Sequence, residues 1–337
     1  MIRWPERPRC GAGSAAAPSI DGGCLVRSHL SAAGRRGFTL TEVLVVAVVI
    51  GILLSLITAA GFSALTRAQE FAISTETGKL ALAMEMFKKQ YGSYPPADLT
   101  PPTGSQETDR LYQFVVRVFP HYIQRLALDS STAGNTLEEK LRNDLQGTQG
   151  NGGKGIFLGD TADEFNPGHA LVFWLAGFSG DAGDPFAGHR ERMKGENLTA
   201  AFYDFDKDNL LKGYYDQQHN AVNDPGAQES QATLTAVYIP NKQAGGLQLG
   251  EINQTAVLYF DSTCYTSTNQ RAYKGFSAYT TTDGKRINPR SFQIVNAGLD
   301  RKLGTGGPSR GGEDADNVAH FSSKLMGDRT AGDESNE

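Results

Sequence analysis

The sequence predicts an α+β fold in which one long N-terminal helix packs on a small antiparallel sheet. Three observations lead to this prediction. An apolar run extends from Val43 to Leu65, and helical periodicity continues behind it through residues 67–91. Short segments with the β-branched and aromatic content of strands follow between residues 233 and 295. A long helix first and strands later is typical of the α+β class, and the stretch between them predicts helical and irregular insertions.

The first half of the predicted helix is long enough to cross a bilayer. Residues 43–65 include no charged side chain. At about 1.5 Å per residue this run measures roughly 35 Å, against about 30 Å of bilayer hydrocarbon. The basic pair Arg35-Arg36 lies on its N-terminal side, and the positive-inside rule keeps that end in the cytoplasm. We therefore predict a single-pass protein with residues 38–66 in the membrane.

The second half of the helix is amphipathic. Charged residues occupy much of its surface, and Gly92 and Pro95-Pro96 end it. Its apolar positions follow the spacing i, i+4, i+7 and i+11, which predicts packing against a folded domain. The members of this stripe are Ile73, Thr77, Leu80, Met84, Phe87 and Tyr91.

The rest of the chain is divided by glycine, proline and polar loops. A glycine- and aspartate-rich irregular region is expected from 180 to 226. His169 is expected to be a buried structural histidine. The expected helices are 108–119, closed by Pro120, 137–145 behind Asn135, and 168–176 behind Asn166-Pro167; the expected strands are 233–239, 255–260 and 292–295.

Composition limits the functions that this chain can have. Six arginines against Glu6 and Asp21 give residues 1–37 a net charge of +4, so the formal −5 of the whole chain leaves −9 on the remainder. An acidic domain does not suit nucleic acid, which attracts basic proteins. Beyond residue 37 only Cys264 remains, so no internal disulfide is expected there. The histidines are scattered and form no catalytic motif, so no catalytic residue is predicted.

The residues in front of the apolar run carry the most specific signal. Glu42 places a carboxylate at the edge of that run, where burial at full depth would cost about 2.5–3.5 kcal/mol, so a partner is expected. Together with Gly37, Phe38, Thr39 and Leu40, this segment resembles the N-terminus of the prepilin family, which comprises type IV pilins and the pseudopilins of type II secretion systems.

That resemblance implies a pilin-like fold and a structural function. A prepilin peptidase would cut after Gly37, Phe38 would become the N-methylated N-terminus, and Glu42 would pair with the terminal amine of a neighbouring subunit. The chain would be a subunit of a type II secretion pseudopilus or a type IV pilus-like filament. It would lie in the inner membrane with its C-terminal domain in the periplasm, and then in a periplasmic or surface filament. The implied partners are prepilin peptidase, other pilin or pseudopilin subunits and the membrane.

Four segments are expected on this basis. They are a leader, 1–37, that is removed or disordered; a transmembrane half of the helix, 38–66; a periplasmic pilin-like domain, 67–325; and a disordered tail, 326–337.

A calcium site is also implied by resemblance, here to the major pseudopilin of type II secretion systems. Residues 81–95 resemble the end of its long helix. Residues 292–298, together with Asp300 and the run 313–316, resemble its C-terminal loop, although the region from 100 to 290 is longer than in that subunit. The carboxylates of Asp300, Asp314 and Asp316 and the backbone carbonyls of Ala297 and Val318 would hold a structural Ca²⁺. A glycine-rich loop capped by carboxylates remains the alternative. A second acidic segment, 204–208, lacks the glycine and glutamate of an EF-hand and is expected to be a solvated turn.

One function of another class stays open. The helix could serve only as a tether for an inner-membrane-anchored periplasmic binding protein or enzyme. A tether does not require Gly37, Phe38 and Glu42 at this spacing, which favours the filament subunit.

Overall fold

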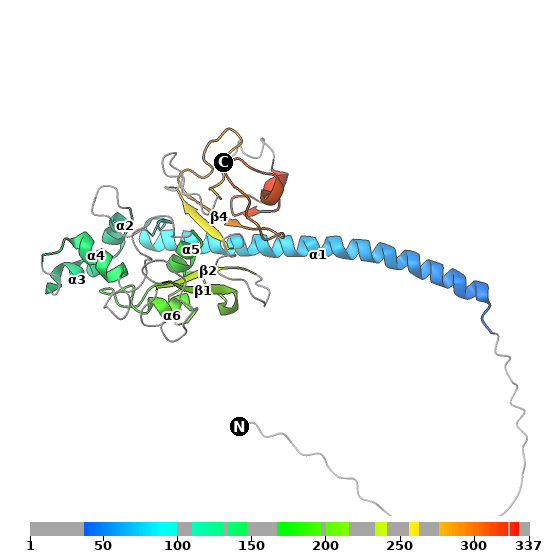
Figure 1. The fold of residues 1–337 in the computed structure, drawn as a ribbon, viewed down its shortest axis with the longest axis horizontal. Coiled ribbons are helices and arrows are strands. Elements are labelled where there is room, and N and C mark those ends of the chain that lie inside the picture. The colour runs from blue at the N-terminus through cyan, green and yellow to red at the C-terminus, as the bar shows by residue number, and fades with distance from the viewer. Residues whose placement is uncertain are drawn as a thin grey trace, which may run out of the picture. The chain divides into compact units, whose positions relative to one another are not determined.

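The structure is a computed structural model of the 337-residue chain. It describes residues 37–99, 110–130, 134–146, 167–196, 200–215, 233–240, 256–262, 276–322 and 324–329 (Figure 1). Its contacts divide the chain into two compact units, Met1–Ala59 and Ala60–Glu337. The predicted leader, except for Gly37, lies outside the described residues, as do Asn166 and Cys264.

One helix, α1 (Leu40–Tyr91), extends over 52 residues and confirms the predicted continuous helix. It begins in the first unit and ends in the second. Gly92 terminates it with φ of +79°, a left-handed conformation that favours glycine. The N–H of Gly92 donates to the carbonyl oxygen of Lys88 at 2.7 Å, which satisfies one of the last carbonyls of the helix.

The predicted apolar stripe of α1 faces the core of the second unit. Thr77, Leu80 and Phe87 are fully buried. The ring centroids of Phe87 and Trp174 lie 5.9 Å apart in an edge-to-face arrangement. The amphipathic half of the helix is therefore anchored by its own domain.

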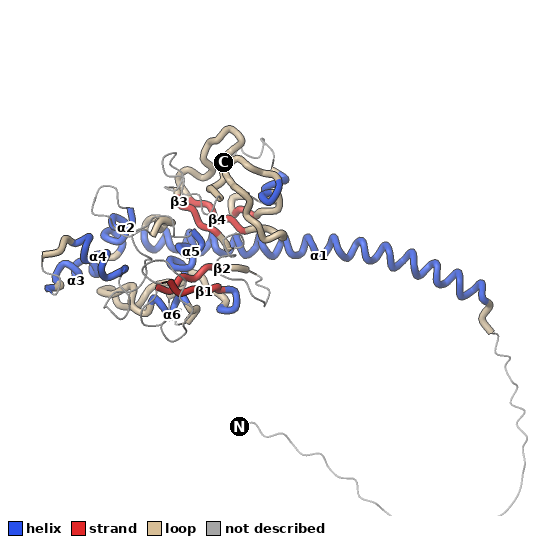
Figure 2. The backbone as a smooth tube through the Cα atoms, in the orientation of Figure 1, coloured by secondary structure: helices blue, strands red, loops and turns tan. Residues whose placement is uncertain are grey.

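The strands form two antiparallel sheets (Figure 2). In the first, β1 (Leu210–Tyr215) pairs with β2 (Thr233–Tyr238), with Leu210 opposite Tyr238. The second has the order β3-β4-β5, with β3 (Leu258–Asp261), β4 (Phe292–Asn296) and β5 (Val318–Ala319).

The predicted strands correspond to β2, β3 and β4, and the α+β class is confirmed. The expectation of an irregular region from 180 to 226 is wrong for helix α6 (His189–Met193) and for β1, whose Lys212-Gly213 step is unusual inside a strand. Pairing with β2 outweighs that low intrinsic preference.

Five shorter α-helices lie in the described part of the second unit. They are α2 (Arg110–Val118), α3 (Pro120–Leu128), α4 (Leu137–Gln146), α5 (Pro167–Leu175) and α6 (His189–Met193). Pro120 does follow the end of α2, but it also opens α3, which the sequence analysis did not predict. Proline suits the first turn of a helix, where its missing N–H is not needed.

Helix α4 begins at Leu137, as predicted, but the capping box places its N-cap one residue later than expected. The Thr136 N–H donates to Glu139 Oε2 at 2.8 Å, and the Glu139 N–H donates to Thr136 Oγ1 at 3.3 Å. Thr136, rather than Asn135, is therefore the N-cap.

Helix α5 is buried along its whole length. Nδ1 of His169 lies 3.2 Å from the backbone nitrogen and oxygen of Ala236 on β2, and burial lowers the pKa of this imidazole to about 4. The indole N–H of Trp174 donates to the carbonyl oxygen of Pro96 at 2.8 Å, just beyond the end of α1. These contacts confirm the structural role expected for His169.

The folded domain extends beyond residue 325. Met326–Asp328 form a 3₁₀ turn, and Met326 is fully buried. The Met326 N–H donates to the Asn317 carbonyl oxygen at 3.0 Å. The prediction of a disordered tail is therefore wrong for residues 326–329, because burial of an apolar side chain fixes them; residues 330–337 lie outside the described part.

Candidate functional site

The segment in front of α1 is accessible. Phe38 is 85 % exposed, and a Cβ added to Gly37 would have no neighbouring atom within 4 Å. The Gly37–Phe38 peptide bond, at which the sequence predicts processing, is therefore not covered by the described parts of its own chain.

A capping box fixes the start of α1. The Thr39 N–H donates to Glu42 Oε2 at 2.8 Å, and the Thr39 hydroxyl lies 2.9 Å from the same oxygen. The Glu42 N–H in turn donates to Thr39 Oγ1 at 3.2 Å. Each residue thus satisfies an N–H group that the first turn of a helix leaves without an intrahelical partner.

This geometry gives Glu42 a partner within its own chain. The predicted partner of Glu42 is only the amine of another subunit, although the Thr-x-x-Glu signature of a capping box is legible at residues 39–42. A carboxylate in the first turn also interacts favourably with the helix macrodipole. Since only one oxygen of Glu42 is hydrogen-bonded to Thr39, the other remains available for a second donor.

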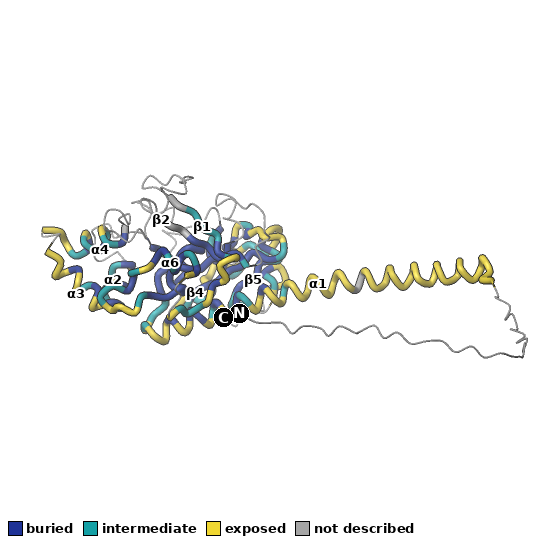
Figure 3. Tube along the Cα trace, turned by 90° about the horizontal axis from the view of Figure 1, so that it is seen from below, coloured by how far each residue is buried: buried dark blue, intermediate teal, exposed yellow. Residues whose placement is uncertain are grey.

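Beyond this cap, the first half of α1 exposes apolar side chains on every face. The exposed fraction ranges from 48 % for Val49 to 82 % for Leu40 among its large apolar residues up to Ile57 (Figure 3). Within the described residues, α1 is a helix long and apolar enough to cross a membrane. Surface of this kind is stable only when lipid or other protein covers it.

The comparison with known proteins agrees with this geometry. Residues 33–58 match the family model described as the prokaryotic N-terminal methylation motif. This chain carries a prepilin-type N-terminus. The match includes Gly37, Phe38 and Glu42 and indicates a type IV pilin-like or pseudopilin-like precursor that prepilin peptidase processes. No curated protein and no solved structure matches the chain.

The structure separates the residues of the predicted calcium site. Asp300 and Asp316 are neighbours, because the Asp300 N–H donates to Asp316 Oδ2 at 2.8 Å. Burial, together with the negative charges of Asp316 and Glu313, raises the pKa of Asp300, although a hydrogen bond from the Lys302 N–H opposes that shift. In this pair Asp300 is exposed and Asp316 is half-buried.

Asp314 is buried instead of joining that pair. Its exposed fraction is 2 %, and both of its carboxylate oxygens accept hydrogen bonds from protein groups. Ala297 is buried next to β4, and Val318 lies in β5 opposite Asn296. Among the described residues, no three His, Cys, Asp or Glu side chains form a group that could hold a metal ion. Asp314 therefore does not join Asp300 and Asp316 as the third carboxylate that the resemblance implied.

The second acidic segment caps a turn. One carboxylate oxygen of Asp206 accepts the Asp208 N–H at 3.0 Å, at the start of a 3₁₀ turn over Lys207–Asn209. Asp204, Asp206 and Asp208 are exposed, as expected for a solvated turn.

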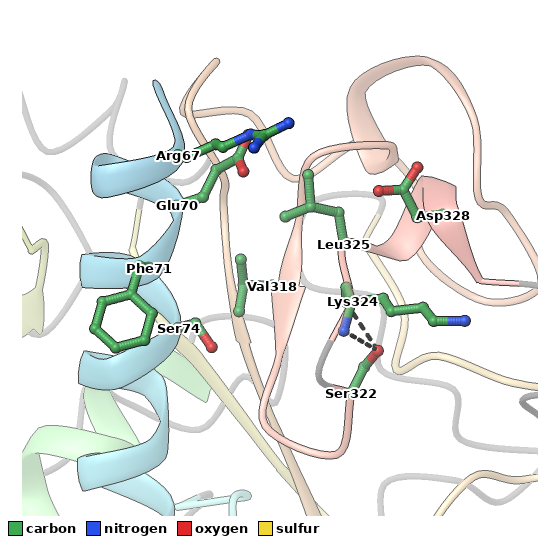
Figure 4. Close-up of a pocket in the computed structure, with 9 residues that line it drawn as sticks. All are labelled: Arg67, Glu70, Phe71, Ser74, Val318, Ser322, Lys324, Leu325 and Asp328. Atoms are coloured by element: carbon green, nitrogen blue, oxygen red, sulfur yellow. Dashed lines mark hydrogen bonds between the residues drawn. The ribbon is translucent and has the colours of Figure 1, made fainter. Parts of the chain in front are cut away.

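A groove of about 540 Å³ lies between α1 and the C-terminal segment of the second unit (Figure 4). Its charged residues come from both sides, but they do not converge: the ammonium of Lys324 points away from α1, and the ring of Phe71 points away from the C-terminal segment. The lining residues are Arg67, Glu70, Phe71, Ser74, Val318, Ser322, Lys324, Leu325 and Asp328. The N-terminal segment, rather than this groove, is the candidate functional site.

Proposed function

We propose that this protein is a structural subunit of a type II secretion pseudopilus or a type IV pilus-like filament, and that it assembles through α1. The observation that carries the proposal is the methylation motif, residues 33–58, which includes the capped start of α1 and most of its apolar, exposed first half. In this proposal the protein has a structural role and no catalytic one.

The exposed half of α1 must stay covered throughout assembly. Leaving one Val, Leu or Ile side chain of this helix half in water would cost about 1.5–3 kcal/mol relative to burying it, and the helix half presents many of them. In the membrane, lipid covers this surface. When the subunit leaves the membrane, helices of other subunits must cover this apolar surface, because its exposure to water is unfavourable.

The polar residues of the motif act before and during assembly. Cleavage after Gly37 would create an amine at Phe38, one residue before the Thr39 cap. The second oxygen of Glu42 could then accept a hydrogen bond from the Phe38 amine of another subunit. The low dielectric of the apolar surroundings would strengthen this ion pair. A helix that served only as a tether would have no use for this arrangement.

The orientation follows from charge. Arg35 and Arg36 keep the N-terminal side in the cytoplasm, so residues beyond the apolar run enter the periplasm and later the filament. The partners in this proposal are prepilin peptidase and other subunits of the same kind or of related kinds.

Mass spectrometry of the N-terminus tests the proposal. The full chain is produced together with a prepilin peptidase and extracted from the membrane. We expect a chain that begins at Phe38 with one added methyl group.

Gly37→Leu is the matched variant, because a bulky residue at this position should block cleavage and leave the leader in place. An uncleaved wild-type chain would support the tether instead. Cleavage of Gly37→Leu to the wild-type mass would show that processing occurs elsewhere.

A further inference from the structure

We infer that the C-terminal loop, residues 297–317, is organised by the buried carboxylate of Asp314 and its protein donors, and not by a bound cation. This inference does not depend on the proposed filament function. It concerns the loop for which resemblance implied calcium, and it rests on the hydrogen bonds of one side chain.

Five donor atoms converge on Asp314. Oδ1 accepts from the Gly306 N–H at 3.0 Å, the Tyr279 hydroxyl at 3.0 Å and the Asn317 amide at 3.4 Å. Oδ2 accepts from the Thr305 N–H at 3.1 Å and lies 3.4 Å from the Thr305 hydroxyl. The two oxygens of a carboxylate offer about four lone-pair sites, so these donors occupy the positions at which a cation would bind.

The donors come from segments that are distant in the sequence. Tyr279 follows the bridge between Ser277 and Gly306, where the Ser277 N–H donates to the Thr305 carbonyl oxygen at 3.0 Å. Asn317 precedes β5, and its carbonyl oxygen accepts the Met326 N–H at 3.0 Å. One carboxylate thus joins the region before β4, the glycine-rich loop and the C-terminal turn.

The groups around Asp314 can balance its charge without a metal ion. Burial, and next the negative charge of Asp314, raises the pKa of the Tyr279 phenol above its ordinary value of 10, so the hydroxyl keeps its proton and donates. The guanidinium of Arg310 lies 5.1 Å from the Tyr279 ring centroid. The protein therefore supplies its own positive charge beside this site.

Glycine makes the close approach possible. A Cβ on Gly304 would lie 2.5 Å from Asp314 Oδ2, and Gly304 has φ of +66°. A Cβ on Gly306 would lie 1.9 Å from the carbonyl oxygen of Ser277. The glycines let the backbone wrap around the carboxylate, which is a role that needs no cation.

Limited proteolysis of the full chain in detergent tests the inference. Arg301 and Lys302 are exposed trypsin sites in the loop, and Arg310 is partly buried there. Cleavage at these sites is followed by mass spectrometry in EDTA and in excess Ca²⁺. We expect the wild-type rates in the two solutions to agree within about twofold, because folding of the loop does not involve calcium binding.

Asp314→Asn should accelerate loop cleavage by at least about fivefold in both solutions, because an amide accepts fewer hydrogen bonds and adds a buried donor. Asp316→Asn is the matched control: Asp316 is half-buried and accepts the N–H of the exposed Asp300, and cleavage should stay within about twofold of wild type. Tyr279→Phe removes a single donor and should give an intermediate rate.

Two outcomes would overturn the inference. One is faster wild-type cleavage in EDTA that Ca²⁺ reverses. The other is an equal effect of Asp314→Asn and Asp316→Asn, which would place both carboxylates in one site. If Asp314→Asn does not fold, Tyr279→Phe decides: its cleavage must exceed that of wild type and be the same in EDTA and Ca²⁺.

Discussion

The two halves of α1 belong to one uninterrupted helix but meet opposite surroundings. Residues 40–58 expose apolar side chains on all faces, whereas residues 73–87 bury a single stripe against the second unit. The amphipathic half finds its partners within the chain, as a surface helix of a globular domain does. The fully apolar half is exposed among the residues that the structure describes, and in the proposed function lipid or other subunits cover it. In the proposed function, the amphipathic half of α1 therefore stabilises the domain and the apolar half mediates filament assembly.

The largest effect that tests this division is expected at Phe87. Its ring is fully buried and lies 5.1 Å from the Phe202 ring centroid and 5.9 Å from that of Trp174. Phe87→Ala should lower the free energy of unfolding of the domain by about 3–5 kcal/mol, because it removes a buried ring and leaves a cavity. Urea unfolding of the chain in detergent, followed by fluorescence of the buried Trp174, measures this change.

Phe71→Ala is the matched control, since it removes the same side chain from the same helix at a position that is 75 % exposed. Its effect should stay within about 0.5 kcal/mol. Equal effects at the two positions would contradict the burial pattern of the second half.

A smaller effect is expected at Glu76, which joins α1 to the first sheet. Glu76 Oε1 accepts the Tyr238 hydroxyl at 2.5 Å and also the Tyr203 hydroxyl. Burial tends to raise the pKa of Glu76, but these hydrogen bonds and the nearby Lys79 outweigh burial and lower it from 4.5. Glu76→Gln should lower the free energy of unfolding at pH 7 by about 1.5 kcal/mol.

The stabilisation by Glu76 should decrease at low pH. A lowered folded-state pKa means that the contribution of Glu76 is present above pH 4.5 and is lost as the pH falls through the folded pKa. The difference between wild type and Glu76→Gln should therefore shrink below pH 4.5. Glu70→Gln is the control, because Glu70 has no hydrogen bond or ion pair within the described part of the chain. A wild-type advantage that grew as the pH fell would contradict this role for Glu76.

The smallest effect on domain stability, and the largest on assembly, is expected at Glu42. Among the described residues, its side chain accepts hydrogen bonds from Thr39, at the start of α1. Glu42→Ala should leave the unfolding of the domain unchanged but prevent incorporation into filaments. Urea unfolding and sedimentation of sheared filaments measure the two properties separately.

Thr39→Val separates the two possible roles of Glu42. This variant removes the capping hydroxyl but keeps the carboxylate and the Phe38 amine. Normal filament formation by Thr39→Val would mean that Glu42 acts through another subunit, and loss of filaments in both variants would mean that the cap itself is required. Filament formation by Glu42→Ala at wild-type levels would remove the assembly role.

Local patterns were sufficient for much of this molecule. The length of α1, its buried stripe, the strands β2, β3 and β4 and the fully buried helix α5 all follow from periodicity and composition. Each of these features depends on residues that are close together in the chain. The methylation motif is equally local, and residues 33–58 alone match it.

The sequence by itself determined the division of α1 into an apolar half and an amphipathic half, because helical spacing decides which side chains share a face. Tertiary structure decided the pairing of β1 and the positions of the side chains of Asp300, Asp314 and Asp316. Asp314 and Asp316 are only two residues apart, yet Asp314 points inward from the 3₁₀ turn Gly312–Asp314 while the half-buried Asp316 accepts the N–H of Asp300. The physical reason is that the donors that hold Asp314 come from Tyr279, Thr305 and Gly306, and only folding brings these groups to one carboxylate.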